Sequence, residues 1–236
     1  MFFVLLVMAG IIPPQSLMAQ RDKVDNLPKF DQRKIHFGFA LGINTADFVI
    51  EHDLSVNDSL ISLEAKRQSG FNLGIISDLH LGPFFDLRFT PTLSFGQRNL
   101  EYSFRQPDNT ISVVVKPIES TWVDFPIGIK YRSARLNNFA AYMVTGFKYS
   151  LDLASQEKVN NEFNDENEII VKLRKHNYAY EIGFGMDFFL EYFKFSPELK
   201  LSVGLNDIRV NDGSEFSDPI SRLNSKIWLI SFNFEG

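Results

Sequence analysis

The chain contains no cysteine among its 236 residues. Disulfide bridges, thiol catalysis, thiolate metal ligands and an anchor lipid attached to an N-terminal cysteine are therefore excluded. Positive charge is not in excess either, because the formal net charge is −5 and the isoelectric point is about 5.4. This balance argues against a nucleic-acid-binding surface.

Long apolar runs are also missing after the first twelve residues, so no later segment can cross a bilayer as a helix. The one apolar run, Phe2–Ile12, is followed by Pro13 and Pro14 and then by Ala19, which has the form of a cleaved export signal. We expect a signal peptide over residues 1–19, an unpatterned periplasmic lead-in over 20–33 and one folded domain over 34–236.

Apolar and polar residues alternate strictly in many stretches after the lead-in. Because side chains alternate across a strand, each such stretch has one continuous apolar face and one polar face. In the clearest example, one parity holds Val123, Phe125, Ile127, Ile129 and Tyr131, and the other holds Asp124, Pro126, Gly128 and Lys130. The eight predicted strands are 35–44, 70–81, 85–95, 121–131, 139–152, 178–190, 194–205 and 226–234.

The connections between these strands alternate between short and long. Three are brief, Gly82–Phe84, Ser133–Asn138 and Glu191–Phe193, whereas four are long and polar, Ile50–Lys66, Gln97–Pro117, Ala154–Lys172 and Arg209–Leu223. This alternation is typical of outer-membrane barrels. The sequence therefore predicts an all-β fold, an eight-stranded antiparallel up-and-down transmembrane β-barrel with short periplasmic turns and long extracellular loops. The alternative is a soluble, lipocalin-like barrel.

Two sets of aromatic residues refine this prediction. Aromatic girdles mark the two membrane interfaces of a barrel. Five residues near strand ends on the apolar parity fit that role, namely Tyr131, Tyr149, Tyr178, Tyr180 and Trp228. The last strand ends in Phe232 and Phe234, which is similar to the C-terminal signal of outer-membrane barrels. We expect outer-membrane lipid to surround the apolar faces.

Charged residues on the polar parity would lie inside the barrel. They are Asp86, Arg88, Asp124, Lys130, Lys148, Glu181, Asp187, Glu198 and Lys200. An eight-stranded barrel is just wide enough for side chains to fill, and buried charges are tolerated only when they pair. We interpret these nine residues as a structural ion-pair plug; the alternative is a proton or ion path.

Catalysis is not indicated by any motif. Of the four histidines, His52 and His176 lie nearest the outer rim, where barrel hydrolases work, while His36 and His80 lie near the periplasmic ends of their strands. No Ser/His/Asp order, metal-ligand spacing or phosphate-binding glycine loop accompanies them. We therefore expect no catalytic, cofactor-binding or metal site, no enzyme activity and no small-molecule substrate.

Three motifs resemble the PorT family, small outer-membrane barrels of Bacteroidetes. They are 37–48 (FGFALGINTADF), 124–131 (DFPIGIKY) and 197–202 (PELKLS). The resemblance implies a non-enzymatic role in the type IX protein secretion system, with other components of that system as partners, and a possible link to gliding motility. Partner contacts are expected in the four long loops or the lead-in. The alternatives are a structural or adhesive OmpA-like barrel and a barrel enzyme.

Overall fold

The computed structural model describes residues 25–53, 55, 57–157 and 169–236. The predicted signal peptide and the first part of the lead-in lie outside these residues. In the described part of the chain, no helix is long and apolar enough to cross a membrane. The elements are the 3₁₀ helix η1 (Phe30–Gln32) and the strands β1 (Ile35–His52), β2 (Leu60–Lys66), β3 (Gln68–His80), β4 (Phe85–Phe89), β5 (Thr92–Arg105), β6 (Ile111–Arg132), β7 (Phe139–Asp152), β8 (His176–Phe189), β9 (Lys194–Gly204) and β10 (Ile220–Glu235).

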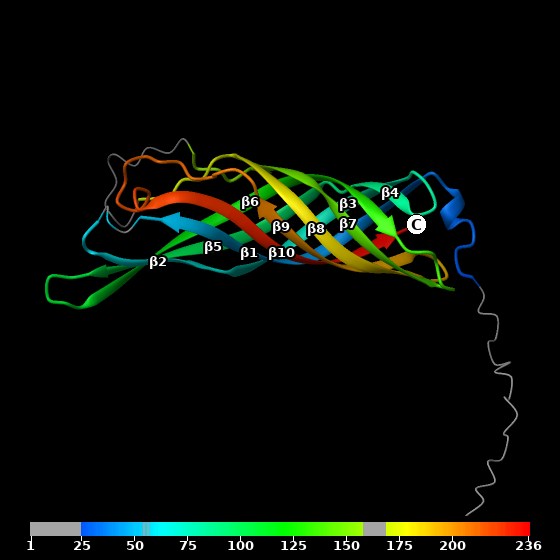
Figure 1. Cartoon of the computed structure of the whole chain (residues 1–236), viewed down its shortest axis with the longest axis horizontal. Coiled ribbons are helices and arrows are strands. Elements are labelled where there is room, and N and C mark those ends of the chain that lie inside the picture. Colours follow the sequence, from blue (N-terminus) through cyan, green and yellow to red (C-terminus); the bar gives the residue numbers. More distant parts are fainter. Residues whose placement is uncertain (1–24, 54, 56, 158–168) are drawn as a thin grey trace, which may run out of the picture.

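The ten strand segments form a ring of eight antiparallel strands, because two of these strands are each interrupted once. This confirms the predicted up-and-down barrel (Figure 1). Only Arg67 separates β2 from β3, and both pair with β5. Only Thr90 and Pro91 separate β4 from β5. The strands β4 and β5 each pair with β3 and with β6. Pro91 interrupts the ladder because proline has no backbone N–H to donate.

The ring closes where β1 pairs with β10. Their register runs from Gly38 opposite Glu235 to His52 opposite Ile220. The same β1 pairs on its other side with β3, from Ile35 opposite Leu79 to Ala46 opposite Gln68. Closure leaves no free sheet edge around this part of the barrel.

Figure 1 shows a long barrel whose two ends differ. We call the end that carries η1, the three short turns and Gly236 the turn end, and the opposite end the loop end. The outer face of the barrel is a band of exposed apolar side chains, as the alternation predicts. It includes Phe37, Phe39, Ile43, Phe71, Ile75, Ile127, Phe147, Ile182, Phe184 and Ile230.

Several strands run much further toward the loop end than the sequence pattern predicts. β1 has 18 residues and β6 has 22, whereas a membrane-crossing strand needs about 10. The predicted loop Gln97–Pro117 is therefore wrong: β5 and β6 continue through it as a hairpin that turns at residues 106–110. In Figure 1 this hairpin projects beyond the other elements. The predicted loop Ile50–Lys66 likewise contains β2, and Arg209–Leu223 contains the start of β10.

Residues 25–33 of the expected lead-in also carry structure. They form η1 and cover the turn end of the barrel, where the Phe30 side chain is 5% exposed. The Asn26 side-chain Nδ2 donates to Phe189 O at 2.9 Å, and Asp31 pairs with Arg132 at 2.8 Å. The sequence did not predict that residues 25–33 pack on the barrel, because the segment is polar and Phe30 is its main apolar contact.

Candidate functional site

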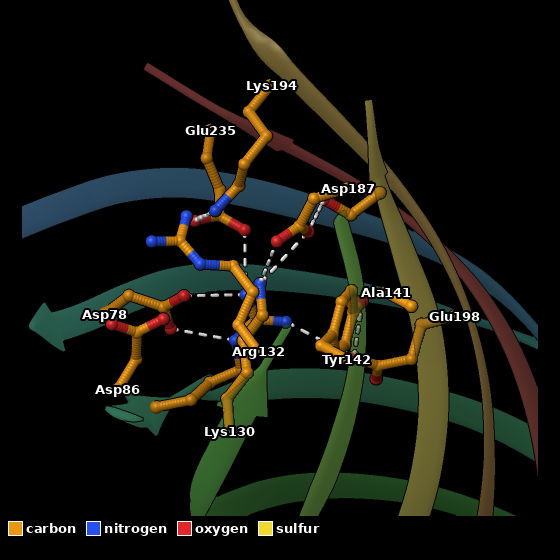
Figure 2. Close-up of polar contacts among 12 residues, drawn as sticks. Asp78, Asp86, Lys130, Arg132, Ala141, Tyr142, Asp187, Lys194, Glu198 and Glu235 are labelled. Carbon is orange, nitrogen blue, oxygen red and sulfur yellow. Dashed lines mark hydrogen bonds and ion pairs between the residues drawn. The ribbon is translucent and has the colours of Figure 1, made fainter. Parts of the chain in front are cut away.

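All nine predicted lumen residues point inward and are buried. Asp86, Arg88, Asp124, Lys130, Lys148, Glu181, Asp187, Glu198 and Lys200 are each at most 8% exposed. The polar parity faces the lumen because the apolar parity covers the outside. Figure 2 shows that carboxylates from several strands converge on cations at the centre of this region.

Arg88 on β4 joins three carboxylates. Its guanidinium donates to Asp78 at 2.8 Å from Nε and 2.6 Å from Nη2. Nη1 donates to Glu198 Oε2 at 3.2 Å, and Nη2 also donates to Glu235 Oε1 at 2.8 Å. A planar guanidinium with five N–H donors suits such a shared position. Arg88 therefore ties β4 to β3, β9 and β10 across the lumen.

Lys130 on β6 forms a second centre beside Arg88. Its Nζ donates to Asp187 Oδ2 at 2.9 Å and lies 3.9 Å from the centre of the Tyr142 ring. The Tyr142 hydroxyl donates to Glu198 Oε2 at 2.9 Å, which connects this centre to that of Arg88 (Figure 2). Lys194 completes the group by pairing with Glu235 at 2.8 Å.

Two lysines extend the network toward the loop end. Lys148 pairs with Glu181 at 3.2 Å and with Asp124 at 3.6 Å. Lys200 pairs with Glu198 at 3.1 Å and with Glu181 at 3.7 Å. Since Glu198 also contacts Arg88, the ion pairs of these two lysines join those of Arg88 in one network along the lumen. Such a network satisfies buried charges that would otherwise be strongly destabilising.

Four members of this network were not among the predicted lumen residues. They are Asp78, Tyr142, Lys194 and Glu235. Asp78, Tyr142 and Lys194 carry the inward parity of their strands, so the alternation was sufficient to find them. Glu235 extends the inward row of Ser231 and Asn233, but its place after the terminal aromatic residues made it look like part of a tail.

Little free space remains between these side chains. A cavity of about 40 Å³ lies at mid-lumen, between Asn72, Arg88, Asp124, Lys148 and Ser231. That is room for a few waters. The cavity is too small for a solute, and the ion-paired residues Arg88, Asp124 and Lys148 form part of its lining.

The turn end of the lumen is covered by Phe30. Its ring stacks on His36 with 3.8 Å between ring centres, meets Phe189 edge-on at 5.7 Å and lies 4.6 Å from Lys194 Nζ. His36 and His80 are thus structural neighbours of the plug, since His80 Nδ1 lies 2.5 Å from Asp86.

The loop end of the lumen is covered by an apolar cluster that we call the dome. Its buried residues are Phe48, Leu60, Leu63, Leu100, Tyr102, Phe104, Ile118, Val171, Leu173, Ile208, Phe216, Ile220 and Leu223. They come from the extensions of β1, β2, β5, β6 and β10 and from the segments before β8 and β10. The Tyr102 hydroxyl donates to Phe216 O at 2.7 Å, which holds one of these segments down.

Arg98 marks the boundary between the polar lumen and the dome. It is 2% exposed, and its guanidinium lies over the rings of Phe48 at 4.8 Å and Trp122 at 5.9 Å. Below it most inward residues are polar, and above it most are apolar. The lumen is therefore closed by different chemistry at its two ends.

The histidines nearest the outer rim have ordinary surroundings. His176 Nδ1 is 2.8 Å from the Tyr149 hydroxyl and its ring is stacked on that tyrosine. His52 ends β1 and is exposed. On the loop-end surface, the hydroxyl and then the backbone N–H of Ser55 donate to Asp53 and lower the pKa of that carboxyl. Among the described residues, no group of three or more His, Asp or Glu could hold a metal ion.

A family model matches this barrel. Residues 18–210 match the model of the outer membrane protein beta-barrel domain. No curated protein matches. Among solved structures, OprG of Pseudomonas aeruginosa is 11% identical, with 86% of this chain and 94% of that one covered and a TM-score of 0.41. Ail, the attachment invasion locus protein of Yersinia pestis, is 12% identical, with 86% and 100% covered and a TM-score of 0.38.

The family match spans most of the chain, and the geometry agrees with it: a closed antiparallel ring, an apolar exterior and a polar lumen. In this class the short turns face the periplasm and the long loops face the outside. The turn end is accordingly periplasmic and the loop end extracellular. The chain belongs to the outer-membrane β-barrel domain family and is a protein of the Gram-negative outer membrane.

Proposed function

We propose that this barrel is a non-enzymatic component of the type IX protein secretion system that works through contacts with other components of that system. The observation that carries the proposal is the resemblance of the segments 37–48, 124–131 and 197–202 to the PorT family. A contribution to gliding motility would follow in species where that system supports movement.

The closed lumen favours binding over conduction as the way such a component acts. Arg88 and Lys148 fill the middle of the barrel with ion pairs, while Phe30 and the dome cover its ends. Cargo therefore has no route through this barrel. Any role in export falls to the surfaces outside the lipid, at the extracellular and periplasmic ends.

A structural or adhesive barrel of the OmpA-like kind is the second candidate. The outward face of the β6 extension favours it, because Ile111, Val113 and Val115 are exposed beyond the part of β6 that faces lipid. Exposed apolar side chains in water often mark contact surfaces. Such a surface would suit a host or cell-surface partner as well as a secretion component.

Gene deletion separates the two candidates. For a secretion component, cargo with the type IX signal accumulates unprocessed in the periplasm, and the wild-type gene restores export. For an adhesive barrel, export is normal and surface attachment or envelope integrity changes. Normal export in the deletion strain would overturn the secretion proposal.

A second strain tests the surface. It carries I111S, V113S and V115S, which leave the inward residues of β6 unchanged. We expect the folded barrel at wild-type abundance, with export reduced severalfold if this face binds a partner. The matched control replaces the half-buried polar residues Ser103 and Glu101 of β5 by alanine and should export normally.

A further inference from the structure

Four cations that form no ion pair in the described part of the chain lie close together in one sector of the extracellular end. We call Arg174, Lys175, Arg222 and Lys226 the basic rim. Within the described residues none of the four forms an ion pair, and three of them are exposed. Three other cations of this end are paired: Lys66 with Glu64 at 3.3 Å, Arg67 with Asp47 at 3.2 Å and Lys172 with Asp212 at 2.9 Å.

Backbone contacts hold the basic rim together. Asn206, just after β9, accepts from the Tyr178 N–H at 2.8 Å and donates to His176 O at 3.2 Å, which fixes this segment against β8. Arg174 Nε donates to Arg209 O at 3.2 Å, and Arg222 Nη2 donates to Leu205 O at 3.4 Å. The segment after β9 thus lies between the starts of β8 and β10. Two strand spacings separate these strands, so the rim is roughly 10 Å wide.

The rim lies at a defined depth. On β8 the outward row descends from His176 through Tyr178 and Tyr180 to Ile182, and Arg174 lies just before the strand; all five are exposed. On β10 it descends from Arg222 through Lys226 and Trp228 to Ile230. Tyrosine and tryptophan mark the interface between acyl chains and headgroups. The cations directly above them therefore lie at the level of the headgroup phosphates.

Nearby carboxylates leave this sector positive. Asp207 accepts from the backbone of Leu223 at 3.0 Å, and Glu157 accepts from the backbone of Lys175 at 3.1 Å. Asp47, opposite Lys226 on β1, is held by Arg67, and Glu51 lies opposite Arg222. Among the described residues, six cations, counting Arg67 and Arg209, stand against these four carboxylates.

We propose that the basic rim binds the phosphate groups of lipid A, the anionic glycolipid of the outer leaflet. Arginine binds phosphate through two parallel N–H donors and lysine through a point charge. Phosphates on a glucosamine headgroup would meet Arg174 and Arg222, while the acyl chains pack on Tyr178, Trp228 and the apolar band below. The proposal does not depend on a role in secretion.

The test compares the purified full-length barrel with the variant R174Q/K175Q/R222Q/K226Q in lipid nanodiscs or detergent micelles. Binding is measured with lipid A, with enzymatically dephosphorylated lipid A, with phosphatidylglycerol and with inorganic phosphate. Each basic residue near an anionic surface contributes a factor of about five, so the variant should bind lipid A at least about tenfold more weakly. The matched control, K66Q, removes a paired cation of the same end that does not contact the rim and should bind as the wild type does.

Several results would overturn the proposal. Equal binding by the fourfold variant and the wild type, or equal binding of dephosphorylated lipid A, would exclude recognition of the phosphates. Equal binding of phosphatidylglycerol would exclude the glycolipid, and displacement by millimolar inorganic phosphate would indicate a free-phosphate site. Folding is checked by heat-modifiable gel mobility. The double variants R174Q/K175Q and R222Q/K226Q, each expected to weaken binding severalfold, keep the test decisive if the fourfold variant does not fold.

Discussion

At the scale of single residues, Arg88 is the side chain on which most of the lumen depends. It contacts carboxylates from three other strands and is itself 4% exposed. A buried ion pair adds little to stability by itself, but removing one partner leaves uncompensated charge in a poorly solvated place. Substitutions of buried ion-pair residues in the lumen should therefore lower the stability of the barrel more than substitutions of exposed ion-pair residues.

We predict that R88M destabilises the barrel by about 3–5 kcal/mol, because Asp78, Glu198 and Glu235 lose their shared cation. Urea unfolding in detergent, followed by the fluorescence of Trp122 and Trp228, measures the change. The control K66M removes an exposed pair and should cost at most about 1 kcal/mol. Equal effects of the two substitutions would contradict the assigned role of Arg88.

Gly146 is a second position where the stability of the barrel depends on one side chain, because there is no room for a Cβ atom. Gly146 on β7 is the Cα partner of Gly128 on β6. A Cβ at residue 146 would lie 2.5 Å from the Gly128 Cα and closer still to the Ile127 carbonyl oxygen. Only backbone movement could relieve such contacts, so the two strands would separate locally.

G146A should therefore destabilise the barrel by more than about 2 kcal/mol or prevent its folding. G96A is the control, because the nearest atom to its added Cβ, Asn44 Oδ1, is 3.6 Å away. We expect G96A to stay within about 0.5 kcal/mol of the wild type in the same urea titration. A tolerated G146A would show that β6 and β7 are less closely packed than the structure indicates.

At the scale of elements, the apolar side chains of a strand change from its outward face to its inward face where the strand leaves the membrane. In the barrel, β5 turns Leu93 and Phe95 outward, whereas in the dome it turns Leu100, Tyr102 and Phe104 inward. The environment on both faces changes at that level: lipid gives way to water outside, and ion pairs give way to apolar packing inside. Arg98 lies where the change occurs.

This reversal explains which parts of the fold could be predicted from sequence. A parity of apolar residues such as Phe125, Ile127 and Ile129 defines an outward face, so the ring and its inward charges follow directly. The extension of β5 breaks that parity at Leu100, and its polar residues Glu101 and Ser103 resemble a loop. Which inward charges pair with each other depends on the register across the lumen, which no local pattern specifies.

The dome should loosen independently of the barrel. We predict that L100A, which empties a fully buried position, destabilises the dome by about 2–5 kcal/mol. Proteases added to intact cells should then cut the extracellular segments, while the heat-modifiable mobility of the barrel stays unchanged. V115A, at an exposed position of β6, is the control. Loss of the folded barrel in L100A would mean that dome and barrel fold as one unit.

The segment before β1 should behave as a cover for the periplasmic end. We predict that F30A destabilises this end, because the contacts with His36 and Phe189 are lost. Hydrogen exchange at β8 and β9 residues near Phe189 and Lys194 should rise at least about tenfold relative to the wild type. L136A, on an exposed periplasmic turn, should leave exchange unaltered. Unchanged exchange in F30A would indicate that η1 does not seal the mouth.

At the scale of the whole molecule, Phe30 and the dome close the two ends of the lumen, and the ion-pair network fills its middle. Such a barrel should conduct no ions. We predict no channel conductance above the baseline of planar lipid bilayers after insertion of the purified protein. Discrete open events would contradict the sealed lumen. As the comparison, K148A/K200A removes both lysines of the upper network and should increase the frequency of brief leak currents.

The pairing of β1 with β10 has a kinetic consequence. It joins residues as far apart as Gly38 and Glu235, so the last bonds of the ring form between the two ends of the chain. Contacts between residues so distant in sequence slow folding, because loop-closure entropy is lost before they form. Until then the apolar faces and unpaired strand edges are available for aggregation. The chain must consequently be protected throughout its passage across the periplasm, and the time needed to join its ends sets how long that protection has to last.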